Sequence, residues 1–115
     1  MAEADGRPLR ATFDEARIAP LPPGARAATL MRHGSMTLRF YQPKGSDPQQ
    51  PHEQDEIYLV AAGSGVFVCD GARVSFGPGD ALFAAARAVH RFEDFTDNFA
   101  AWVVFYGPKG GESPG

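Results

Sequence analysis

The sequence has a single cysteine, Cys69, among its 115 residues. One cysteine excludes an intrachain disulfide and any zinc finger built on cysteine pairs, and it is compatible with a reducing cytoplasm. The longest uncharged apolar run, residues 99–106, is far shorter than the ~20 residues of a transmembrane helix. The N-terminus lacks the basic start and apolar stretch of a signal peptide. We therefore expect a cytoplasmic protein that does not enter a membrane.

The sequence also lacks an excess of basic residues. The formal net charge is −3, and no lysine or arginine run occurs. Nucleic acids and anionic membranes are therefore poor candidate partners. The chain contains no Ser-His-Asp order, no phosphate-binding loop and no dinucleotide fingerprint. These absences exclude the common nucleophile and nucleotide sites that short motifs reveal, and they leave the few histidines as the main candidates for chemistry.

The length allows one small domain, with roughly two thirds of the unfolded surface buried on folding. The 13 glycines and 10 prolines indicate frequent turns between short elements. We expect a single domain over residues 1–115, with a core over about residues 27–107 and loose tails at residues 1–8 and 109–115. The proline-rich residues 19–24 are expected to cross one end of the domain as an irregular segment.

Hydrophobic residues recur with a period of two, the pattern of a half-buried strand. Met36, Leu38 and Phe40 alternate in this way with their neighbours. The pair Asp70-Gly71 between two such runs is a strong hairpin signal. The pattern predicts an all-β antiparallel sandwich or barrel. Further strands are expected at residues 57–60, 66–69, 73–76, 81–84, 89–92 and 100–106.

The three histidines are His33, His52 and His90. On a strand, Gln50, His52 and Glu56 would point to the same face because side chains alternate. His52 and Glu56 would still be about 13 Å apart by strand rise alone, so they can share an ion only if the strand bends or bulges. A second histidine from another strand is needed, and His90 is the candidate. His33 fits no motif and is expected to be structural or exposed.

Two segments resemble the paired motifs of the cupin superfamily. Gln50-x-His52-x3-Glu56-x6-Gly63 is similar to the first motif, which usually has two histidines before the glutamate. Gly79-x5-Ala85-x-Arg87-x2-His90-x3-Asp94 is similar to the second motif, with Ala85, Arg87 and Asp94 in place of its usual proline, glycine and asparagine. The resemblance covers about residues 36–106. It implies a double-stranded β-helix, the jelly-roll barrel of small single-domain cupins, with a metal ion inside.

Carried over residue by residue, the resemblance implies a metal-binding set of Gln50, His52, Glu56 and His90. Two histidines and one carboxylate suit divalent iron, manganese, nickel or zinc. Gln50 stands where the family has its first histidine, and its amide oxygen would be a weak ligand that water could replace. Taken alone, His52 and His90 would more often be structural histidines than ligands, Glu56 would usually be a surface carboxylate, and Gln50 could equally be a solvated loop residue. The joint motif therefore carries the prediction.

Two aromatic residues are expected to line a substrate pocket beside the metal. Tyr58 shares the strand parity of Glu56, and Phe92 shares that of His90; the alternative for both is plain core packing. Three functions remain open: a metal-dependent enzyme such as a dioxygenase, isomerase, cyclase or lyase acting on a small organic molecule, a ligand-binding or sensing module with a weak or vestigial metal site, and a structural dimer unit.

We also expect a homodimer, because a short barrel leaves edge strands whose backbone groups can pair with another copy. The segment Leu9–Phe13 alternates apolar and polar residues. This alternation predicts an edge strand or a strand exchanged between the two copies.

Overall fold

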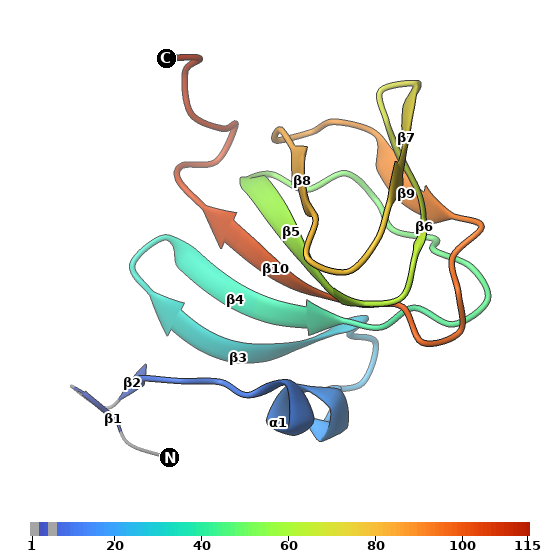
Figure 1. Ribbon diagram of the computed structural model, residues 1–115. Helices are drawn as coiled ribbons and strands as arrows, with labels where there is room; N and C mark the ends of the chain where they lie inside the picture. The colour runs from blue at the N-terminus through green and yellow to red at the C-terminus, as the bar shows by residue number, and fades with distance from the viewer. Residues whose placement is uncertain (1–2, 5–6) are drawn as a thin grey trace.

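Two antiparallel sheets face each other and form the barrel (Figure 1). The structure is a computed structural model that describes residues 3–4 and 7–115. In spatial order, the larger sheet contains β3 (Ala27–His33), β4 (Met36–Tyr41), β10 (Ala100–Tyr106), β5 (Asp55–Ala62) and β8 (Ala81–Ala84). The smaller sheet contains β7 (Ala72–Phe76), β6 (Gly65–Cys69) and β9 (His90–Glu93). This arrangement is the expected jelly-roll.

Outside the barrel, β1 (Glu3–Ala4) pairs with β2 (Arg7–Pro8), and α1 (Phe13–Ile18) follows. No helix within the described part of the chain is long and apolar enough to span a membrane. The strands expected within residues 36–106 are all present. β3 is an additional strand that the sequence pattern did not predict.

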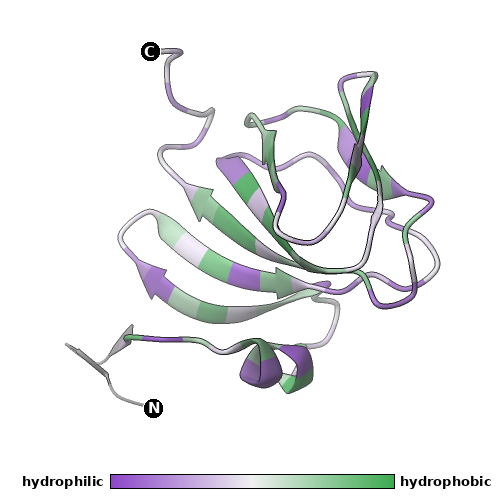
Figure 2. Ribbon diagram, in the orientation of Figure 1, coloured by the Kyte–Doolittle hydropathy of each residue, from purple (hydrophilic) through white to green (hydrophobic). Residues whose placement is uncertain are grey.

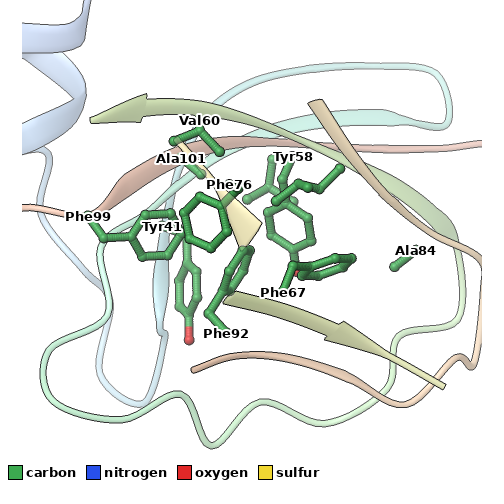
Figure 3. Close-up of a cluster of buried hydrophobic side chains, with 11 residues drawn as sticks. Tyr41, Tyr58, Val60, Phe67, Phe76, Ala84, Phe92, Phe99 and Ala101 are labelled. Carbon is green, nitrogen blue, oxygen red and sulfur yellow. The ribbon is translucent and has the colours of Figure 1, made fainter. Parts of the chain in front are cut away.

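An aromatic core fills the space between the sheets (Figure 3). Phe92 of β9 lies at its centre, with ring centroids 4.9 Å from Tyr58, 5.2 Å from Phe67, 5.5 Å from Phe76 and 4.7 Å from Phe99. Aromatic pairs at these separations are stabilised beyond the burial of their area. Both sheets contribute rings to this core. The core therefore fixes the position of one sheet relative to the other and fills part of the barrel interior.

The outer face of the larger sheet carries a second, smaller core. Figure 2 shows hydrophobic and hydrophilic residues alternating along β4. Phe40 of β4 is buried with Ala100 of β10 and Ala16 of α1. The ring of Phe13 meets that of Phe40 edge-to-face, with centroids 5.7 Å apart. Helix α1 therefore covers part of the sheet surface that faces away from the barrel interior.

The expected strand at Leu9–Phe13 is wrong, because Phe13 is the first residue of α1. The side chain of Thr12 accepts a hydrogen bond from the backbone N–H of Glu15, and the Glu15 carboxylate accepts one from the backbone N–H of Thr12. This reciprocal capping box satisfies two N–H groups at the helix start. Local capping thus prevails over a short alternation of apolar residues.

Residues 42–54 connect β4 to β5 without forming a strand. The buried carboxylate of Asp47 anchors this connection inside the barrel, where it accepts hydrogen bonds from the backbone N–H of Phe92 and from the hydroxyl of Tyr41. Part of the segment expected to be a loose C-terminal tail is bonded as well, since the N–H of Glu112 donates to Asp55. The β4–β5 connection also carries Gln49 and His52, which lie at the site described below.

Candidate metal centre

His52, Glu56 and His90 come together inside the barrel. One ligand atom from each lies within 4.8 Å of the other two. Nε2 of His90 is 2.8 Å from Oε1 of Glu56, and Nε2 of His52 is 3.9 Å from the same oxygen. The side chains of Glu56 and His90 are buried, whereas the side chain of His52 is 35% exposed. The two histidines therefore meet at one carboxylate, as expected, and His52 is on the accessible side.

Glu56 and His90 are held by strands of different sheets. Glu56 is on the buried face of β5, between β10 and β8. His90 is the first residue of β9 and pairs with Cys69 of β6. Nδ1 of His90 lies 2.9 Å from the carbonyl oxygen of Ala88, to which it must donate. Fixing the proton on Nδ1 directs Nε2 toward Glu56, the orientation that metal-binding histidines adopt.

His52 reaches the site from the β4–β5 connection, which is held by the loop of the second motif. The backbone N–H of Arg87 donates to the carbonyl oxygen of His52 over 2.6 Å. Arg87 has a left-handed φ of 66°, which explains why the family pattern has glycine here. Its guanidinium pairs with Glu53 at 2.9 Å. The arginine therefore keeps the turn that glycine would make and links it to the residue beside His52.

The amide at the site belongs to Gln49, whereas Gln50 is exposed. Oε1 of Gln49 lies 3.2 Å from Nε2 of His52 and accepts a hydrogen bond of 3.1 Å from the hydroxyl of Tyr58. Nε2 of Gln49 donates to Asp47. The expectation for Gln50 assumed a strand, and strand parity does not apply to this irregular connection. The side-chain amide at the site was expected from Gln50 and comes from Gln49, one residue earlier.

Of the two aromatic residues expected at the pocket, Tyr58 lines a cavity of about 230 Å³ beside the site. Its hydroxyl oxygen is 3.2 Å from Nε2 of His90. Phe92 instead lies in the aromatic core, where its side chain is 2% exposed. Parity correctly directed Phe92 inward, but the rings around it separate it from the cavity. Sequence reasoning missed Gln49 and Asp47, which belong to no periodic pattern.

The electrostatics of the two histidines differ. Burial lowers the pKa of His52, and the positive charges of His90 and Arg39 act in the same direction, against the attraction of Glu56. Burial would also lower the pKa of His90, but its hydrogen bonds to Glu56 and Ala88 outweigh this and raise the pKa. His52 is therefore neutral at pH 7 and has a lone pair ready for a metal. The raised pKa of His90 opposes metal binding, because a bound metal needs the unprotonated Nε2.

One atom tests whether the site fits a metal ion. Oε2 of Glu56 is buried and has no hydrogen-bond partner within the described part of the protein. A buried carboxylate oxygen without a partner is unfavourable because it has lost its water without replacement. A divalent cation among Glu56, His52 and His90 would satisfy it, and two imidazoles and a carboxylate are a donor set that first-row transition metals accept. The residues fit a metal ion.

The fold and this group of residues define a jelly-roll barrel that can hold a metal ion. The family model described as "Cupin domain" matches residues 37–106. The chain belongs to the cupin family.

The chain is also similar to a curated protein and to solved structures. A Streptomyces coelicolor protein, SCO3923, is 28% identical over 82 residues, which cover 70% of this chain and 78% of that protein. A Salinispora arenicola "Cupin 2 conserved barrel domain protein" superposes with a TM-score of 0.62 at 23% identity, over 87% of this chain and 88% of that one. An RmlC-like cupin from Shewanella frigidimarina gives 0.65 at 13% identity, over 86% and 90%. The structural likenesses concern the fold alone.

Proposed function

We propose that this protein is a metal-dependent cupin in which His52, Glu56 and His90 hold a divalent iron, manganese, nickel or zinc ion and act on a small organic molecule. The observation that carries the proposal is the orphaned Oε2 of Glu56, a buried carboxylate whose other oxygen, Oε1, lies 2.8 Å from Nε2 of His90 and 3.9 Å from Nε2 of His52. Such an ion leaves coordination positions open and polarises or activates an oxygen-containing substrate. Isomerase, cyclase, lyase and dioxygenase reactions all use this chemistry.

The residues around the ion would orient the substrate. Burial, followed by the negative charge of Glu56, raises the pKa of Tyr58 well above its ordinary value. The Tyr58 hydroxyl therefore stays protonated and can donate a hydrogen bond to a substrate oxygen in the cavity. The ring of Phe105, whose centroid is 5.1 Å from that of His52, shields one side of the imidazole from water.

A non-catalytic ligand-binding or sensing role is the second candidate. Gln49 favours it, since its amide oxygen already accepts the Tyr58 hydroxyl at 3.1 Å and its amide nitrogen is fixed by Asp47 at 2.7 Å. A hydroxyl held by a fixed acceptor is less available for proton transfer. Turnover of a bound compound would favour the enzyme, and saturable binding without turnover would favour the sensor.

The test is elemental analysis of protein purified without a metal-affinity column. We expect a stoichiometric first-row metal in the wild type, its loss in His90→Ala and its retention in His33→Ala. His33 is the matched control because it is exposed at the end of β3. A wild type that neither retains a metal nor binds added Zn²⁺, Mn²⁺, Ni²⁺ or Fe²⁺ would refute the proposal. Thermal-shift screening of small molecules on the loaded protein then searches for the substrate.

A further inference from the structure

The cavity beside the candidate metal centre has both polar and apolar walls. Its volume is about 230 Å³, and Gln49, His52 and Tyr58 line one part of it. Val103 and Phe105, from the inward face of β10, line another part. Pockets for drug-sized ligands measure ~300–1,000 Å³. The cavity is therefore suited to a small molecule that has an apolar portion and at least one polar group.

Arg39 brings a positive charge into this cavity. It lies on β4 opposite Val103 of β10, and its guanidinium carbon is 5.7 Å from the centroid of the Phe105 ring. Nε of Arg39 is buried without a hydrogen-bond partner within the described part of the chain. An arginine cannot relieve this by losing its proton, because a guanidinium stays protonated in proteins. The cavity thus contains a charged donor whose acceptor must come from elsewhere.

The remaining charges around the cavity favour an anion. Arg26 is a second arginine of the lining, and none of the described residues that line the cavity is acidic. Arg39 takes part in none of the ion pairs found between described residues, in contrast to the surface arginine Arg73, which pairs with Glu93 at 2.7 Å. The positive charges of Arg26 and Arg39 favour a negatively charged group at this end of the cavity, and so does the planar guanidinium of Arg39 as a hydrogen-bond donor.

We propose that the cavity binds a small organic carboxylate, whose charged group is held by Arg39 and whose apolar portion packs between Val103 and Phe105. A planar carboxylate can accept two N–H groups of a guanidinium together. The opposite end of such a molecule faces His52 and Tyr58. This inference rests on the proposed function, because it names the substrate class of the same site. Arg39 then determines both which substrates bind and how they are oriented.

Butyrate and butyramide are suitable probes, since they have similar size and differ in charge. Their affinities can be measured by NMR titration of metal-free and Zn²⁺-loaded protein. In both forms we expect the wild type to bind butyrate at least about tenfold more tightly, the difference that a hydrogen bond to a charged group provides. Arg39→Gln should abolish the preference, and Arg39→Lys should retain part of it. Arg91→Gln, at an exposed arginine paired with Glu93, should behave like the wild type.

Three results would overturn the inference. Equal affinity for butyrate and butyramide in the wild type would show that charge is not recognised. A preference that survives in Arg39→Gln but disappears in His90→Ala would place the carboxylate on the metal. Arg39-dependent binding of inorganic phosphate without binding of butyrate would assign a different anion. A failure of the proposed function is distinguishable, since it removes metal retention but leaves the butyrate preference of the metal-free protein measurable.

Discussion

Nε2 of His90 lies 2.8 Å from Oε1 of Glu56, and both side chains are excluded from solvent. The two residues come from different sheets, so only the closed barrel brings them together. The pair uses one carboxylate oxygen and leaves the other, Oε2, without a partner. Buried ionisable groups with incomplete hydrogen bonding are costly and cluster at functional sites. The ion pair is therefore incomplete, and a metal ion would satisfy the remaining carboxylate oxygen.

The first prediction concerns which glutamine influences the metal. Gln49→Ala should weaken Zn²⁺ binding by up to about tenfold, because an amide is a weak neutral ligand or a hydrogen-bond partner of His52. Gln50→Ala should leave the affinity unchanged, since Gln50 is exposed. His52→Ala should abolish binding. Competitive Zn²⁺ titration of the three variants at fixed pH measures the difference. A larger effect at Gln50 than at Gln49 would contradict the geometry.

The glutamine also shows what the sequence could and could not predict. Period-two alternation located the strands that hold Glu56 and His90, because a strand fixes side-chain direction through its pleat. The connection that carries Gln49 has no period, so its conformation depends on the buried anchor Asp47 rather than on its own pattern. The position of the amide could therefore not be predicted to the residue.

Two other differences between the predicted and the observed secondary structure also have local causes. β3 was not predicted because its register with β4 shifts between Thr29 and Met31, which interrupts the alternation that identifies a strand. Helix α1 did leave a signal, the pair Thr12 and Glu15 at capping-box spacing, which outweighs the alternation at Leu9–Phe13. The substrate-binding role expected for Phe92 failed for another reason, because parity gives the face of a residue but not its depth in the core.

The second prediction is that pH has opposite effects on the metal-free and the loaded protein. Despite its burial, the hydrogen bonds of His90 to Glu56 and Ala88 raise its pKa in the folded protein above the ordinary value of 6.5. In the metal-free protein, the protonated His90 therefore stabilises the fold below its unfolded pKa, and this stability is lost as the pH rises through the folded pKa. Zn²⁺ binding requires deprotonation, so affinity should fall about tenfold per pH unit below the folded pKa.

Thermal unfolding between about pH 5 and 8.5, with and without Zn²⁺, checks this prediction. The melting temperature of the loaded protein should rise with pH relative to that of the metal-free protein. His33→Gln provides the control for replacing a histidine outside the site. Parallel curves with and without the metal would mean that His90 does not exchange a proton for the ion.

The third prediction explains the last glycine of the first motif. A Cβ at Gly63 would lie 2.5 Å from the backbone Cα of Phe99, and its φ is +83°. Gly63→Ala should therefore destabilise the fold by about 2–5 kcal/mol, from overpacking together with left-handed strain. Gly71→Ala is the matched control, since Gly71 has a φ of +85° and no atom within 4 Å of the added Cβ. Gly71→Ala should lower the free energy of unfolding by only about 1–2 kcal/mol. Chemical denaturation measures the free energy of unfolding of both variants. If both lose the same amount, the close contact with Phe99 is not the cause.

The last prediction is the homodimer, for which the structure suggests a specific surface. Phe83 of the edge strand β8 is 53% exposed, and Leu59 of the neighbouring strand β5 is 42% exposed. On the other side, Leu59 pairs with Trp102 of β10, so apolar side chains continue across the outer face of the larger sheet. A second copy that covers β8 would bury these side chains and pair the free edge of the strand.

Light scattering at micromolar concentration should give a dimeric mass for the wild type and a monomeric mass for Phe83→Glu, because a charge buried in an apolar interface without a partner is strongly unfavourable. Val89→Glu, at an exposed apolar residue outside this face, should remain dimeric. Circular dichroism of each variant verifies that the monomer is folded. If Val89→Glu dissociates the dimer while Phe83→Glu does not, the contact involves the smaller sheet. A monomeric wild type would refute the dimer itself.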